Sequence, residues 1–155
     1  MASFAYHKAI QEIATGVIVP GTTTLKIMLV NSTYTPNKDD LVVDAGGASD
    51  AADAEITATN YTRGWGGAGR KTATITSADD ATNDRAVLII ADLTWTALGG
   101  GVNDTVVGAI LIKEGGANDT TSRLIAYFDL TDTATNGGDF ILDFDGTNGN
   151  IRFTV

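Results

Sequence analysis

Apolar residues recur at every second position along much of this chain, and clusters of glycine, asparagine and aspartate interrupt the pattern at short intervals. In 25–30, for example, Leu25, Ile27 and Leu29 share one face of an extended segment. A period of two is the spacing of side chains on one face of a β-strand, and Gly, Asn and Asp form the turns that separate strands. The pattern predicts about eight strands, at 25–30, 56–62, 70–76, 86–95, 105–113, 124–130, 140–144 and 151–155.

Short strands separated by turn residues are typical of all-β folds, so we expect an antiparallel β-sandwich or a jelly-roll-like barrel. The composition agrees, because 16 of the 19 acidic residues are Asp and the chain has 18 Gly and 23 Thr. Asp and Gly favour turns, whereas Thr favours strands. The polar run 31–55 is expected to form a long loop that is flexible and acidic at 44–55. The length of 155 residues fits one domain.

The first 24 residues differ from the rest, because their apolar residues recur at helical spacing. Ser3 can cap a helix whose apolar face contains Phe4, Ile10 and Ile13, and Gly16 ends it. A break with turn residues follows at 17–24. We therefore divide the chain into an N-terminal helix or arm with its linker at 1–24 and a β-sandwich domain at 25–155. The apolar face of the arm needs burial, either against its own domain or against a neighbouring subunit.

The net charge of −9 and the pI near 4.3 argue against two classes of partner. An acidic surface repels phosphate backbones and anionic lipids, so we expect binding neither to nucleic acid nor to membranes. No run of apolar residues is long enough to span a bilayer, and the first residues lack the pattern of a secretory signal. The chain is expected to be made and kept in a cytoplasm.

Catalytic and metal-binding residues are scarce in this sequence. Cysteine is missing, His7 is the only histidine, and the aspartates lie in turn-like contexts. These features remove thiolate chemistry and sites with several histidines, and they leave no carboxylate pair that stands out. We expect no enzyme activity, no cofactor and no metal. His7 is interpreted as a surface or interface residue, and Trp95 as an aromatic residue in the core or at its rim.

The glycine-rich stretch 63–72 has the composition of a phosphate-binding loop without its order. Arg70 separates Gly69 from Lys71, and the alternating threonines that follow predict a strand where a phosphate loop needs a helix. Two interpretations stay open. The stretch is either a packed loop around an anchored Trp65, or a contact loop in which Arg63, Trp65, Arg70 and Lys71 touch a partner, since Trp and Arg are enriched in binding hot spots.

Two acidic clusters resemble cation sites only in part. The run 143–150 begins like a calcium loop, but its glycine and its final residue do not match that loop, and its Asn-Gly pair favours a hairpin turn. Asp79, Asp80 and Asp84 are interpreted as a solvated turn at 77–84.

Several segments together resemble a known family. They are LKIMLVNSTYTPNKDD (25–40), NYTRGWGGAGRKT (60–72), DDATNDRAVLIIADLTWTAL (79–98), AILIKEGG (109–116), SRLIAYFDL (122–130) and NGGDFILDFDGTNGNI (136–151). In their order and spacing they are similar to small structural proteins of tailed bacteriophages and prophages.

This resemblance implies a virion structural protein without catalytic residues, best placed as a capsid decoration (cement) protein. It further implies a trimer at local three-fold positions of the head, with the major capsid protein and copies of itself as partners. Such a protein is made in the cytoplasm of the bacterial host and ends on the surface of the head. Our interface candidates are Phe4, Ile10 and Ile13 in the arm, and Arg63, Trp65, Arg70 and Lys71 in the glycine-rich stretch.

Two alternatives remain beside this interpretation. The first is a phage tail component, such as a tube, tip or fibre-base protein. The second is a carbohydrate- or receptor-binding β-sandwich module, since β-sandwiches with exposed Trp and Asp often bind sugars, and Trp65 and Trp95 are the residues that would test it.

Overall fold

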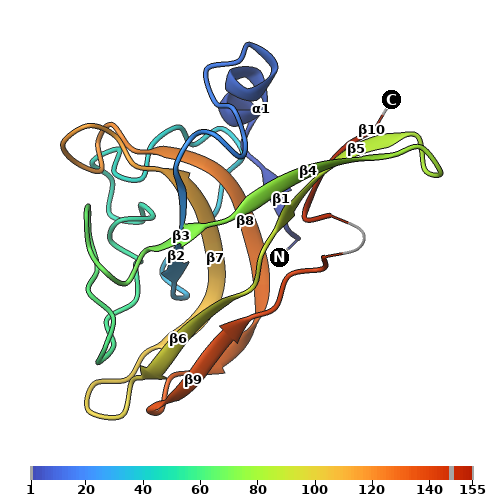
Figure 1. The fold of residues 1–155 in the computed structure, drawn as a ribbon. Helices are drawn as coiled ribbons and strands as arrows, with labels where there is room; N and C mark the ends of the chain where they lie inside the picture. The colour runs from blue at the N-terminus through green and yellow to red at the C-terminus, as the bar shows by residue number, and fades with distance from the viewer. Residues whose placement is uncertain (1, 147–148, 155) are drawn as a thin grey trace.

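The computed structural model describes residues 2–146 and 149–154, and it confirms the all-β class (Figure 1). All strand pairs are antiparallel. The elements, in chain order, are β1 Phe4–Ala5, α1 His7–Ala14, β2 Leu25–Val30, β3 Lys71–Ala73, β4 Ile75–Asp80, β5 Arg85–Ile90, β6 Leu93–Leu98, β7 Thr105–Lys113, β8 Arg123–Ala134, β9 Gly138–Leu142 and β10 Ile151–Thr154.

The largest sheet has the order β1-β8-β7-β2-β3 and contains the centre of the core. In β2, Ile27, Met28, Leu29 and Val30 are all fully buried, so both faces of this strand are covered. In β7, the run from Ala109 to Ile112 is equally buried. Central strands covered on both faces read as continuous apolar runs rather than as alternating ones.

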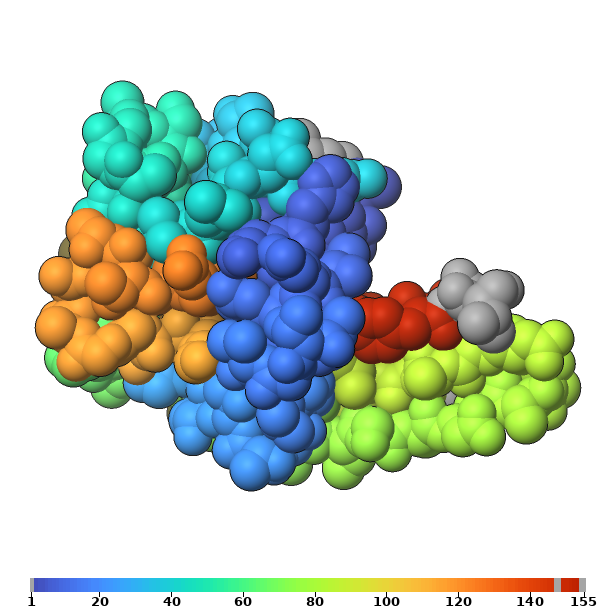
Figure 2. All heavy atoms as spheres, turned by 90° about the horizontal axis from the view of Figure 1, so that it is seen from above, coloured from blue at the N-terminus to red at the C-terminus, as the bar shows by residue number. Residues whose placement is uncertain are grey.

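Two smaller sheets complete the fold, with the orders β10-β5-β4 and β6-β9. The predicted strand 86–95 is divided between β5 and β6, which meet at Ala91 and Asp92. There the Ala91 N–H donates to the Thr74 carbonyl, and the Asp92 carboxylate accepts a hydrogen bond from the Phe144 N–H. These bonds end one sheet and begin the next. Seen from above, the β4–β5 hairpin projects from the body, with β10 beside it (Figure 2).

The N-terminal segment folds back on its own domain, which was one of the two alternatives for its apolar face. Phe4 and Ala5 pair with Tyr127 and Ala126 of β8, so the predicted helix start at Ser3 is wrong. Helix α1 begins at His7, and the Ser3 hydroxyl instead accepts a hydrogen bond from the Asp129 N–H. The strand forms because β8 offers an open edge there, and that pairing overrides the local capping signal.

Three other predictions change. Residues 56–62, predicted as a strand, form none; an isolated bridge between Val30 and Glu55 lies just before them. The predicted turn 77–84 is shorter, because β4 extends to Asp80 and pairs with β5. The acidic loop 44–55 is anchored by buried Ala51 and Ala54. The predicted hairpin turn at 143–150 includes Thr147 and Asn148, which lie outside the described residues.

Among the residues that the structure describes, no helix is long and apolar enough to cross a membrane.

Candidate functional site

The glycine-rich loop 63–69 is a packed element that connects Tyr61 with β3. Gly64 and Gly66 have φ angles of +86° and +71°, which side chains rarely adopt. A Cβ on Gly67 would lie 2.2 Å from the Thr62 carbonyl oxygen, and one on Gly69 would lie 2.6 Å from the Tyr61 ring. The glycines therefore serve turn geometry and close packing, and strand β3 follows them directly.

Arg70, predicted as a contact residue, is instead buried, with 3% of its surface exposed. Its guanidinium donates to both carboxylate oxygens of Glu55, at 2.9 and 2.7 Å, and to both of Asp119, at 2.6 and 2.9 Å. Glu55 is itself 1% exposed. The prediction that Arg70 contacts a partner is wrong because two carboxylates distant in sequence already occupy its donors.

The ion network extends from this pair into neighbouring strands. Glu114, which follows β7, lies 3.6 Å from Arg70 and 2.6 Å from the ammonium of Lys26 on β2. The Tyr61 hydroxyl donates to Glu55 and accepts the Leu29 N–H. The network thus joins the loops before β3 and after β7 to the centre of the sheet.

The electrostatics of this network keep Arg70 and Tyr61 in single protonation states. Burial alone would lower the pKa of Arg70, but its hydrogen bonds to Glu55 and Asp119 outweigh burial and hold that pKa above its usual value. Burial, followed by the charge of Glu55, raises the pKa of Tyr61 well above 10. The role of the network is therefore structural: it fixes the position of the loop.

Trp65 is a large apolar side chain that this fixed loop presents to solvent, with 45% of its surface exposed. Its Nε1 donates to the Gly115 carbonyl at 2.8 Å, and the neighbouring Gly66 N–H donates to Glu114 at 3.1 Å. The indole is therefore anchored at its polar edge, as one of the two interpretations of the loop expected. An anchored aromatic ring loses little conformational entropy when it binds a partner.

The other basic candidates of this region lie around the loop. Arg63 is exposed and donates to the carbonyl oxygens of Ala52 and Asp53. Lys71 is half-buried, with its ammonium 5.8 Å from the centre of the Trp95 ring.

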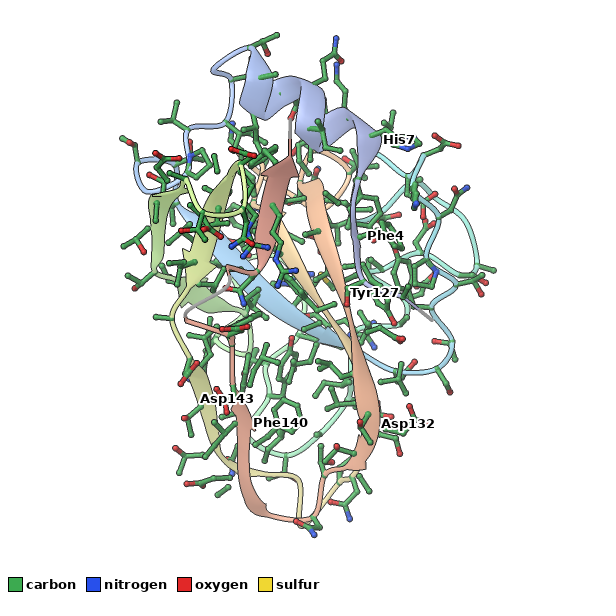
Figure 3. All side chains as sticks on the ribbon, turned by 90° about the vertical axis from the view of Figure 1, so that its right-hand side faces the viewer. Phe4, His7, Tyr127, Asp132, Phe140 and Asp143 are labelled. Atoms are coloured by element: carbon green, nitrogen blue, oxygen red, sulfur yellow. The ribbon has the colours of Figure 1, made fainter. Side chains whose placement is uncertain are left out.

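The seven interface candidates do not form one surface. Phe4 packs against Tyr127 at the β1–β8 edge of the large sheet (Figure 3), whereas the glycine-rich loop leads into β3 at the opposite edge. In the arm, Phe4 and Ile13 pack partly buried against the core, and Ile10 remains 41% exposed.

A residue that the sequence analysis overlooked lines a hollow that also contains Gly115, whose carbonyl accepts the hydrogen bond from Trp65. Val17 is 57% exposed, and it lines a shallow hollow of about 340 Å³ together with Gly115, Gly116 and Thr121. The charged side chains of Glu12, Lys113, Glu114 and Arg123 line the same hollow. Figure 2 shows the blue N-terminal segment beside the orange loop at 114–122. We call Val17, Trp65, Gly115 and Gly116 the Trp65 surface. The signal in the sequence was weak, because Val17 lies in a linker without periodicity.

Trp95 is a core residue, as one of its interpretations expected. It is 2% exposed, and its Nε1 donates to the Gly69 carbonyl at 2.6 Å. A buried indole offers no face to a sugar, so the role of Trp95 in a carbohydrate-binding site is wrong.

His7 lies on the surface at the start of α1, where its Nδ1 is 2.8 Å from the Asp39 carboxylate. Within residues 2–146 and 149–154, no group of three His, Cys, Asp or Glu residues is placed to hold a metal ion. Comparison of the chain with protein-family models, with curated proteins and with solved structures finds no match.

Proposed function

We propose that this chain is a structural protein of a tailed-bacteriophage virion that decorates the head shell and stabilises it. The observation that carries the proposal is the Trp65 surface, where the exposed side chains of Trp65 and Val17 lie on either side of Gly115 and a buried ion network backs the loop. Trp is enriched among the few residues that dominate binding energy at protein interfaces. A surface of this kind fits a passive protein partner, and the resemblance of the sequence indicates which partner.

In this proposal the major capsid protein contacts the Trp65 surface. Three copies of the chain assemble at each local three-fold position, so that one apolar surface per copy meets the shell. The net charge of −9 keeps free subunits soluble before they bind. The all-β body with its buried core supplies a rigid spacer between contacts, which keeps the entropic cost of binding low.

The proposal is tested on heads of the phage or prophage that encodes the chain. Heads from a deletion strain are heated, genome release is followed with a nucleic-acid dye, and purified protein is added back. We expect heads without the protein to release their genome at a lower temperature, and wild-type protein to restore the higher one. Heads that are equally robust without the protein would contradict the stabilising role, and binding to tails alone would contradict the placement.

The Trp65→Ala variant tests the surface within the same assay. Truncating a hot-spot Trp costs about 2 kcal/mol or more, so we expect binding to heads to weaken by about 30-fold. Ile141→Ala is the matched control, since Ile141 on β9 is an apolar side chain with 61% of its surface exposed, at a different site. Equal binding by the two variants would contradict the role of the Trp65 surface.

A further inference from the structure

Strand β4 is an open edge of the projecting β4–β5 hairpin. All six of its residues pair with β5 on one side, and in the described part of the chain no strand pairs with it on the other. Residues 76–79 are exposed. In Figure 2 the β4–β5 hairpin extends away from the body, so its tip is accessible to a second molecule.

The hydrogen-bond pattern shows which backbone groups point outward from this edge. The Ala91 N–H donates to the Thr74 carbonyl, so this pair is hydrogen-bonded and the pairs that follow alternate. By that alternation Ile75, Ser77 and Asp79 direct their N–H and C=O groups away from β5. A Cβ on Gly21 would lie 3.3 Å from the Ile75 carbonyl oxygen, so the linker already covers the edge at Ile75. Ser77 and Asp79 stay open.

This edge also lacks most of the features that usually prevent strand pairing. Natural proteins protect edge strands with proline, charged side chains (lysine above all), bulges or a covering loop, and of these β4 has two aspartates and partial cover by the linker. Strand β4 reads ITSADD, pairs with β5 in unbroken register and is covered only at Ile75. One of its two acids is already neutralised, because the Asp80 carboxylate lies 2.5 Å from Nε of Arg85.

We propose that β4 pairs antiparallel with β4 of a second copy of this chain, with the two-fold axis at Ala78. In this register Ser77 lies opposite the partner's Asp79, and these two residues exchange backbone hydrogen bonds. Thr76 lies opposite the partner's Asp80. The hydroxyls of Ser77 and Thr76 can each donate to the carboxylate opposite, and no acidic residue lies directly opposite another. A register centred on Ser77 would instead require the edge at Ile75, which the linker covers.

The small side chain at the axis fits this arrangement. Ala78 faces the partner's Ala78 in a pair without backbone hydrogen bonds, where the two Cα atoms approach to about 4.5 Å. The result is a continuous six-stranded sheet, to which each of the two copies contributes β10, β5 and β4. This contact goes beyond the proposed function and does not depend on it, because it uses the β4–β5 hairpin and leaves the Trp65 surface free to bind a shell.

Cysteine substitution tests the pairing directly, because the chain has no cysteine of its own. A Cα separation of about 4.5 Å lies within the range that a disulfide bridges. We expect Ala78→Cys to form a covalent dimer under mild oxidation about ten-fold faster than Ala86→Cys. Ala86 is the matched control, since it is exposed on the same hairpin but lies on β5, one strand away from the open edge. Equal rates for the two variants would overturn the proposal.

A second substitution shows whether backbone pairing drives the cross-linking. The Ser77 N–H points away from β5, so Ser77→Pro removes a donor of the dimer without removing a bond of the hairpin. In the Ala78→Cys background we expect Ser77→Pro to return cross-linking to the rate of Ala86→Cys, while circular dichroism stays native. Native protein that still cross-links at the full rate would overturn the proposed register. Neither result depends on whether the protein binds phage heads.

Discussion

Replacing Arg70 with alanine is expected to lower the free energy of unfolding by about 3–5 kcal/mol, the usual cost of breaking a buried ion pair from one side. The substitution leaves Glu55, which is 1% exposed, without the guanidinium that bonds both of its oxygens. The Tyr61 hydroxyl and the Gly64 N–H still donate to Glu55, but no cation then balances its buried charge. Urea unfolding followed by tryptophan fluorescence measures the change, since Trp65 and Trp95 both contact this region.

Arg63→Ala is the matched control for Arg70→Ala. Arg63 lies on the same loop but is exposed, and its hydrogen bonds go to backbone carbonyls and to Thr57. Its loss is expected to cost about 1 kcal/mol. Similar small losses for the two variants would show that the network around Arg70 contributes little to stability.

Raising the pH above 10 is expected to unfold the protein, because all four of its tyrosines are buried. Burial is the main cause that raises the pKa values of Tyr6, Tyr34 and Tyr61 well above 10, and it raises that of Tyr127 to about 12. In the unfolded chain these groups ionise near pH 10. The folded state therefore has its full stability below pH 10 and loses it as the pH rises towards the folded pKa values.

The loss is about 1.4 kcal/mol per tyrosine per pH unit, or about 5 kcal/mol at about pH 11 for four tyrosines. Tyrosinate absorbance and circular dichroism, recorded together, measure it. We expect both signals to change in one transition, and Tyr34→Phe to reduce the pH sensitivity by about a quarter. Tyrosines that ionise near pH 10 while the circular dichroism stays native would contradict this prediction.

Two central strands of the large sheet were predictable from the sequence pattern. The predicted segments 25–30 and 105–113 coincide with β2 and β7. Burial on one or both faces leaves a direct mark in the sequence there, because each position must match its environment.

The β4–β5 hairpin was missed for the opposite reason. The predicted turn 77–84 contains most of β4, whose residues 76–79 are exposed and therefore carry no apolar pattern. What makes this segment a strand is its pairing with the apolar β5, and such pairing is a property of the tertiary structure.

The candidate site was predictable in its location more than in its residues. A Trp between glycines indicated an anchored loop, and Trp65 is indeed held by the Gly115 carbonyl. Arg70 has the same local context as Arg63, yet one is buried and the other exposed. The difference arises from Asp119, which lies 49 residues further along the chain and reaches Arg70 only in the folded state. Local sequence contains no signal for that approach.

The β4–β5 hairpin and the Trp65 surface lead to one account of the molecule. We propose that a rigid antiparallel body uses the Trp65 surface to bind a shell and the open edge of β4 to bind a second copy. The two sites involve different elements, so a lattice of copies can use both. The tests are also separate, because cross-linking at Ala78 needs only purified protein, whereas the Trp65 surface is tested on heads.

The central claim of this account is that the chain belongs on the outside of a phage head. A cryo-EM reconstruction of the particles, compared with particles from a deletion strain, measures this most directly. We predict additional density on the outer surface of the head at local three-fold positions, into which three copies fit with their Trp65 surfaces facing the shell. Identical heads in the two reconstructions, or additional density confined to the tail, would contradict it.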